Sequence, residues 1–218
     1  MSARLRVSRT HYPVTALGPG KRLGIWVQGC SLSCKGCMSL DTWNPAGGVE
    51  VSVDDVLDLW REAVAAGAAG VTVSGGEPLQ QPAAVRELLL GIDEIRSASP
   101  SPCDILVYTG YEEAELTDAQ HRAVEPADVL VTGRFDIARP TTLIWRGSAN
   151  QRMVMRTDLG RVRYAEYVDA TPDHAPLQVR ADGDGIWLIG TPRRGALSEL
   201  ERDLRRKGLG IVDVSWRP

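Results

Sequence analysis

Three cysteines fall within eight residues of the chain, in the segment Cys30-Ser-Leu-Ser-Cys34-Lys-Gly-Cys37. This C-x3-C-x2-C spacing directly follows a short apolar run. A tight group of thiols in a chain long enough to build its own core indicates metal binding or redox chemistry rather than a disulfide framework. Three thiolates on one loop suit a [4Fe–4S] cluster held by three of its four irons, and the fourth iron is then open to a ligand.

Two other chemistries use cysteines at comparable spacings. A structural zinc ion needs four ligands, so Cys103 or a histidine distant in sequence would have to complete the set. A dithiol pair of Cys34 and Cys37 would leave Cys30 without a role. Both alternatives stay open at this point. Cys103 stands alone before an apolar run and is expected to be a small buried core residue.

A second motif, Gly75-Gly76-Glu77-Pro78, ends the next apolar run of the chain. Adjacent glycines let the backbone approach a ligand closely. A carboxylate such as Glu77 can accept strong, charge-assisted hydrogen bonds from an ammonium group. Alone, the motif would describe an ordinary strand-to-helix turn. Both motifs, however, fall at the carboxyl ends of expected parallel strands, which is where α/β proteins place their sites.

The elements expected around these motifs alternate between strands and helices. Apolar residues at helical spacing between Val53 and Val64 predict a helix, and Ser52 with Asp55 resembles a capping pair at its start. The expected strands are 23–27, 70–74, 104–109 and 128–131, and the expected helices are 53–66, a segment after Pro82, and 112–122. This alternation predicts an α/β fold, with a parallel sheet that curls into a barrel or part of one and helices packed outside it.

The last third of the chain has a different pattern. Apolar runs at 177–181 and 186–189 flank Asp182-Gly-Asp-Gly185 and predict a hairpin. A helix carrying Leu197, Leu200 and Leu204 and a last strand at 211–216 complete a ββαβ unit. We therefore expect a core at residues 1–155 and a small C-terminal extension at residues 156–218, packed on the core at the open edge of its sheet.

Composition narrows the class of protein. The chain has 218 residues, a formal net charge of −3 and 43% hydrophobic residues, which is enough for a real core. The acidic balance argues against a protein whose main partner is nucleic acid. No apolar run approaches the ~18 residues that a membrane helix needs, and no signal peptide is evident. We expect a cytoplasmic protein without a nucleic-acid or membrane partner.

Together, the cysteine and Gly-Gly-Glu motifs resemble those of the radical S-adenosylmethionine (SAM) superfamily. Within it, the chain is most similar to activating proteins of the anaerobic ribonucleotide reductase, a glycyl radical enzyme. The likeness covers about residues 10–155 and rests on further segments: Gln28-Gly-Cys30, Asp41-Thr-Trp-Asn-Pro45, Tyr108-Thr-Gly-Tyr111, Asp128-Val-Leu-Val-Thr-Gly-Arg-Phe135 and Trp145-Arg-Gly-Ser-Ala-Asn-Gln-Arg152. Two positions depart from the pattern, since Met38 replaces the usual Tyr and Thr132 the expected Asp.

The resemblance implies a partial (β/α) barrel of the radical SAM type and two cofactors, a [4Fe–4S] cluster and SAM. Cys30, Cys34 and Cys37 would ligate the cluster, whose open iron would chelate the amino and carboxylate groups of SAM. Reduction would then cleave SAM to methionine and a 5′-deoxyadenosyl radical. The remaining positions implied to contact SAM or the substrate are Gly36 and Met38 by their backbone, together with Gly75, Gly76, Glu77, Thr109, Asn150 and Gln151.

The resemblance also implies partners. These are an electron donor such as a flavodoxin or ferredoxin, and a glycyl radical enzyme that loses a hydrogen atom from one glycine. An alternative is a radical SAM enzyme that acts directly on a small molecule or peptide. An alternative of another class is an iron–sulfur or zinc module for electron transfer or interaction, without SAM cleavage.

Overall fold

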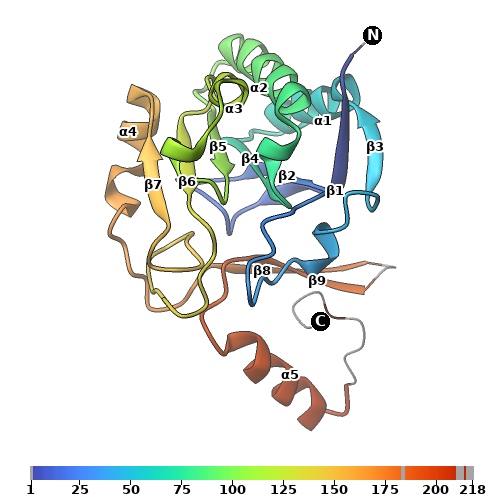
Figure 1. Cartoon of the computed structure of the whole chain (residues 1–218), viewed down its shortest axis with the longest axis vertical. Coiled ribbons are helices and arrows are strands. Elements are labelled where there is room, and N and C mark those ends of the chain that lie inside the picture. Colours follow the sequence, from blue (N-terminus) through green and yellow to red (C-terminus); the bar gives the residue numbers. More distant parts are fainter. Residues whose placement is uncertain (1, 183–184, 210–213, 215–218) are drawn as a thin grey trace.

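A seven-stranded mixed sheet forms the centre of the computed structural model, which describes residues 2–182, 185–209 and 214 (Figure 1). Its strand order is β3-β1-β2-β4-β5-β6-β7. The strands are β1 (Arg4–Val14), β2 (Arg22–Val27), β3 (Val49–Ser52), β4 (Gly70–Gly75), β5 (Asp104–Tyr108), β6 (Val129–Thr132) and β7 (Arg152–Met155). Neighbouring pairs from β2 to β6 are parallel, so four carboxyl ends meet at one edge.

The sequence predicted a parallel sheet, but the observed sheet is parallel only in its centre. β1 pairs antiparallel with β2 and β3, and β7 pairs antiparallel with β6. β1 was not among the predicted strands, although Leu5 and Val7 alternate there with Arg4 and Arg6, which is the two-residue period of a strand. Four parallel strands joined by helices are compatible with part of a barrel, and the specific radical SAM barrel stays a prediction.

Helices from the first two-thirds of the chain cover one face of this sheet (Figure 1). The α-helices are α1 (Val53–Ala65), α2 (Pro82–Ser97), α3 (Asp118–Ala123), α4 (Asp158–Tyr164) and α5 (Ala196–Arg206), with short 3-10 turns η1 (Leu40–Thr42), η2 (Pro78–Gln80), η3 (Glu113–Glu115) and η4 (Ala165–Tyr167). The predicted capping pair is confirmed, because the Ser52 side chain accepts from the Asp55 N–H and the Asp55 carboxylate accepts from the Ser52 N–H. The helix expected at 112–122 is instead η3 followed by α3.

Alternate residues of each central strand point to opposite faces, and both faces are covered. Leu23, Ile25 and Val27 of β2 pack in the main core with apolar residues of α1 and α2. The intervening Trp26, by contrast, packs with Ile189 and Trp187 from the C-terminal part of the chain. The sheet is therefore the middle layer between helices and the C-terminal hairpin.

That hairpin consists of β8 (Leu177–Asp182) and β9 (Gly185–Gly190), which form a separate two-stranded sheet. It lies on the face of the large sheet opposite α1 and α2 rather than at an open edge (Figure 1). The predicted helix is α5, and the predicted strand at 211–216 falls largely outside the described residues. α4 packs on the core, where Tyr164 is fully buried.

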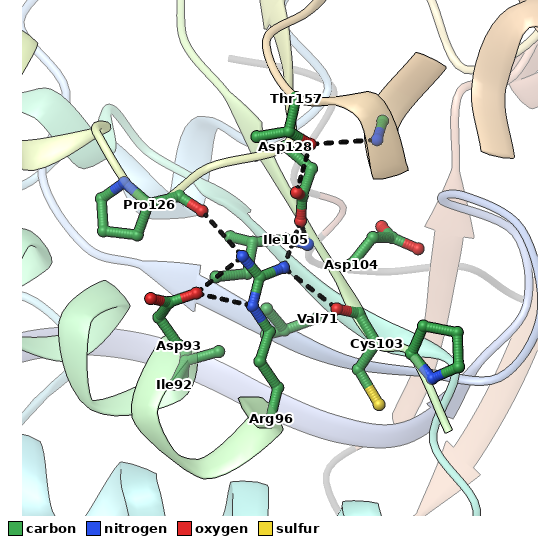
Figure 2. Close-up of polar contacts among 12 residues, drawn as sticks. Val71, Ile92, Asp93, Arg96, Cys103, Asp104, Ile105, Pro126, Asp128 and Thr157 are labelled. Atoms are coloured by element: carbon green, nitrogen blue, oxygen red, sulfur yellow. Dashed lines mark hydrogen bonds and ion pairs between the residues drawn. The ribbon is translucent and has the colours of Figure 1, made fainter. Parts of the chain in front are cut away.

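Two buried ion pairs lie at the amino ends of the parallel strands, opposite the edge where the motifs end. Arg22 and Asp104, the first residues of β2 and β5, are both fully buried and pair at 2.5 Å. Figure 2 shows the second pair, in which Arg96 of α2 contacts the Asp128 carboxylate and donates to the Cys103 carbonyl at 3.0 Å. The first pair joins β2 to β5, and the second joins α2 to the start of β6. Neither pair lies at the carboxyl edge of the sheet, where the motifs end.

Candidate metal and cofactor site

A cavity of about 1210 Å³ opens at the carboxyl ends of β2, β4, β5 and β6. The structure gathers ten of the eleven predicted site residues around it: Cys30, Cys34, Gly36, Cys37, Met38, Gly75, Gly76, Glu77, Thr109 and Gln151. The eleventh, Asn150, does not line the cavity. Two motifs that are about 40 residues apart in sequence thus share one space, because parallel strands β2 and β4 end side by side.

The three motif cysteines are free and partly buried, and a backbone N–H faces each sulfur. These N–H groups belong to Leu32 for Cys30, Phe135 for Cys34 and Ser39 for Cys37, and the Ser39 N–H donates to its sulfur at 3.4 Å. Burial raises the pKa of the Cys30 and Cys34 thiols above the usual value. Iron offsets such a shift, because a coordinating thiol is held deprotonated by the positive charge of the metal.

The arrangement fits a cluster better than a single ion. Within residues 2–182, 185–209 and 214, no group of three or more His, Cys, Asp or Glu side chains converges on one metal ion. A [4Fe–4S] cluster does not require such convergence, because each cysteine binds a different iron. Cys103 is 2% exposed and its sulfur contacts the Ala68 carbonyl at 3.2 Å, so it is a core residue and not a fourth ligand.

Gly75 and Gly76 are needed where the end of β4 meets the start of the cysteine loop. Gly75 has φ +103°, and a Cβ there would lie 2.5 Å from the backbone of Val27. A Cβ on Gly76 would lie 2.3 Å from the Gly29 carbonyl oxygen, closer than side chains tolerate. The close approach that the glycines permit is therefore at least partly to the protein's own backbone, immediately before Cys30.

Glu77 is 1% exposed, and its carboxylate is already well bonded. It accepts from the N–H groups of Leu79 at 2.9 Å and Gly110 at 2.7 Å, and from the Thr109 hydroxyl at 2.8 Å. Burial nevertheless raises the pKa of Glu77. In this structure, Glu77 and Thr109 tie together the ends of β4 and β5. Their contact with SAM stays a prediction.

Asn150 and Gln151, predicted to face ribose or substrate, contact the loop that follows β6. The Gln151 amide donates to the Gly133 carbonyl at 3.0 Å and accepts from the Gly147 N–H at 2.7 Å. Asn150 donates to the Arg134 carbonyl at 2.8 Å. Both amides thus hold backbone, and their contact with a ligand stays a prediction.

The C-terminal extension contributes to the cavity wall, which was not predicted from the sequence. All six residues of β9 line it, as do leucines of α5. Trp187 packs edge-on against Trp26 with ring centroids 4.8 Å apart, and Arg9 lies 5.2 Å from the Trp187 ring centroid. A signal was present, because Trp187 and Ile189 alternate with their neighbours, but nothing in the sequence says which face of the sheet they would meet.

Comparisons with known proteins agree with this site. Residues 16–154 match the family model of a 4Fe-4S single cluster domain. The chain is similar to proteins named anaerobic ribonucleoside-triphosphate reductase-activating protein. It is 37% identical over 147 residues to the protein of Escherichia coli strain K12, a match that covers 65% of this chain and 93% of the relative. It is 40% identical over 151 residues to that of Haemophilus influenzae, with 65% and 92% covered, and 32% identical over 141 residues to that of Enterobacteria phage T4, with 65% and 88% covered.

No helix in the described part of the chain combines the length and apolarity needed to span a bilayer.

Proposed function

Because the chain belongs to the family of anaerobic ribonucleoside-triphosphate reductase-activating proteins, which carry a 4Fe-4S single cluster domain, we propose that it activates such a reductase. The target is a glycine of the partner enzyme, which loses a hydrogen atom and becomes a glycyl radical. The observation that carries the proposal is the shared cavity, since the three motif cysteines and the Gly-Gly-Glu motif line the same space.

When bound, the cluster and SAM together supply the reductive cleavage that yields methionine and a 5′-deoxyadenosyl radical. The chain's own residues bind and position these groups. Cys30, Cys34 and Cys37 would hold the cluster as thiolates, with a backbone N–H facing each sulfur. The glycines at the end of β4 bring this strand against the cysteine loop, and this junction would hold the methionine end of SAM.

The sheet and the extension enclose the site from two sides. Trp26 and Trp187 form an apolar part of the cavity wall. Restricted water access favours a radical step, because it prevents side reactions of a reactive intermediate. The electron enters from a one-electron donor of the flavodoxin or ferredoxin class, and Lys35 and other exposed residues of the cysteine loop are accessible to it.

The experiment compares Cys34→Ala with Cys103→Ala after anaerobic reconstitution with iron and sulfide. Both variants remove one thiol, but only Cys34 lines the cavity. We expect Cys103→Ala to keep the cluster, to form 5′-deoxyadenosine with dithionite and SAM, and to generate a glycyl radical signal in the partner reductase. Cys34→Ala should lose all three. Full cluster content in Cys34→Ala, or loss of the cluster in Cys103→Ala through anything other than misfolding, would contradict the assignment.

One observation favours the alternative of direct action on a small molecule or peptide. The extension adds β9 and leucines of α5 to the cavity wall, which gives a small ligand more apolar surface to contact. If this alternative holds, 5′-deoxyadenosine formation will be stimulated by a small substrate and not by the reductase. The same assay, run with and without the reductase, separates the two.

A further inference from the structure

The loop that follows β6 covers the cysteine loop. We call residues 133–137 the covering loop. A Cβ on Gly36 would lie only 2.5 Å from Ile137 Cδ1, so the two loops are in direct contact. The Phe135 N–H faces the Cys34 sulfur. The backbone of the covering loop thus reaches one of the three cysteines, although it lies about 100 residues away in sequence.

Asn150 fixes the peptide group that makes this contact. The Arg134 carbonyl and the Phe135 N–H belong to one planar peptide unit. Asn150 Nδ2 donates to that carbonyl at 2.8 Å, on the side of the unit opposite its N–H. Hydrogen bonds in such a chain polarise one another, so the Asn150 donor strengthens the Phe135 donor.

The Asn150 side chain has one other polar atom. Its Oδ1 is buried and has no hydrogen-bond partner among the residues that the structure describes. Such an unpaired buried acceptor is costly. The favourable contribution of the Asn150 amide is therefore the hydrogen bond that its Nδ2 donates to the Arg134 carbonyl. Gln151 supports the same loop one peptide earlier, because it donates to the Gly133 carbonyl at 3.0 Å and is anchored by the Gly147 and Ser148 N–H groups.

We propose that Asn150 is a positioning residue that raises the reduction potential of the cluster, through the Phe135 N–H that it holds against Cys34. The inference rests on the proposed function, since it requires a cluster bound by the three cysteines. Addition of one electron makes the cluster more negative, and a hydrogen bond to a ligand sulfur stabilises that added charge. A loss of the donor therefore lowers the potential and makes the cluster harder to reduce.

The test uses Asn150→Leu, which keeps the side-chain volume and adds no charge. The matched control is Gln120→Leu, because Gln120 also bridges backbone, from the Leu79 carbonyl at 2.9 Å to the Thr117 N–H at 2.9 Å, but lies outside the cavity. Both are reconstituted anaerobically, and iron and sulfide are quantified. The cluster is then titrated with dithionite and redox mediators, and the reduced form is counted by electron paramagnetic resonance.

At the potential where the wild-type cluster is half reduced, we expect the reduced-to-oxidised ratio of Asn150→Leu to fall about threefold or more. This corresponds to about 28 mV, at 59 mV per tenfold change for one electron. Gln120→Leu should titrate like the wild type. An unchanged ratio in a fully loaded Asn150→Leu overturns the inference, and so does an equal shift in Gln120→Leu, which would indicate general loosening.

Gln151→Met provides a second variant if Asn150→Leu does not load. It should shift the ratio in the same direction by a smaller factor, and an unchanged ratio there would also count against the inference. Because the titration contains neither SAM nor reductase, it is independent of activity. A wild-type protein that binds no cluster would instead refute the proposed function itself.

Discussion

The two ion pairs at the amino ends of the strands should respond very differently to the same substitution. Asp104→Asn and Asp128→Asn both replace a buried carboxylate that pairs with an arginine. The Arg22 side chain, which pairs with Asp104, is fully buried, whereas Arg96, which pairs with Asp128, is 14% exposed and has a second carboxylate partner in Asp93. Asp104→Asn therefore leaves the Arg22 guanidinium charge buried without a carboxylate partner.

No orientation of an asparagine satisfies the groups around position 104. Its two carboxylate oxygens accept from Arg22 at 2.5 and 3.1 Å, and one also accepts from the Tyr164 hydroxyl while the other faces Arg163. An amide NH₂ at either place meets a guanidinium N–H. Removing one partner of a buried pair costs about 3–5 kcal/mol, so we expect that loss in the unfolding free energy of Asp104→Asn.

Position 128 tolerates the amide. An oxygen in the place of Oδ2 still accepts from the Ile105 N–H and Arg96, and the NH₂ then faces the Thr157 hydroxyl, which can accept (Figure 2). Charged hydrogen bonds exceed neutral ones by roughly 1 kcal/mol, so the expected loss is about 1–2 kcal/mol.

Urea unfolding of the cluster-free proteins, followed by circular dichroism, measures the difference. With an m-value of about 3 kcal/mol/M, Asp104→Asn should lower the midpoint by about 1–2 M and Asp128→Asn by about 0.3–0.7 M. The reasoning would be refuted by an Asp128→Asn loss that equals or exceeds that of Asp104→Asn. A loss below about 1 kcal/mol for Asp104→Asn would refute it as well.

Two further predictions concern the C-terminal hairpin. Trp187→Ala removes the contact with Trp26, a loss of about 1.5–3 kcal/mol, so β8 and β9 amides should exchange hydrogen about tenfold to a hundredfold faster. Ile186→Ala should change this exchange little, because the Ile186 side chain is 68% exposed. Equal effects of the two substitutions would contradict the packing. Burial and the nearby Arg180 lower the pKa of His11, so the fold favours its neutral form, and the stability it contributes is present above about pH 6.5 and lost as the pH falls through its folded pKa. The urea midpoint of the wild type should therefore fall more between pH 7 and about pH 5 than that of His11→Phe, and parallel curves would show that another group dominates.

The sequence was sufficient for the elements whose signal is local. α1 begins at its capping box, and β2, β4 and β5 begin or end within about a residue of their predicted limits. Because the motifs directly follow such strands, the gathering of Cys30 and Gly75 at one edge was predictable as well. The breakdown of the predicted helix at 112–122 reflects a Leu116–Thr117 step with extended backbone, which restarts the helix at a new cap.

The remaining features depend on contacts between distant segments, which periodicity does not encode. The carboxylate of Glu77 is a suitable partner for an ammonium group. Its burial, and the hydrogen bonds that it accepts from the Gly110 N–H and the Thr109 hydroxyl, follow only from the folded chain. Asn150 and Gln151 likewise have amides suited to a ligand, and the structure uses them to hold the covering loop. The position of the hairpin on the face of the large sheet that carries Trp26 is a third example, since either face was compatible with the hairpin's sequence pattern.

The position of the hairpin in the chain also sets an order of events during synthesis. Every strand of the large sheet and all three motif cysteines precede residue 156, whereas the hairpin that walls the cavity comes after α4. A ribosome releases the N-terminal part first, and domains begin to fold in that order. Iron and sulfide delivered to the nascent chain meet the cysteines before the hairpin exists, whereas delivery to the released protein has to pass it.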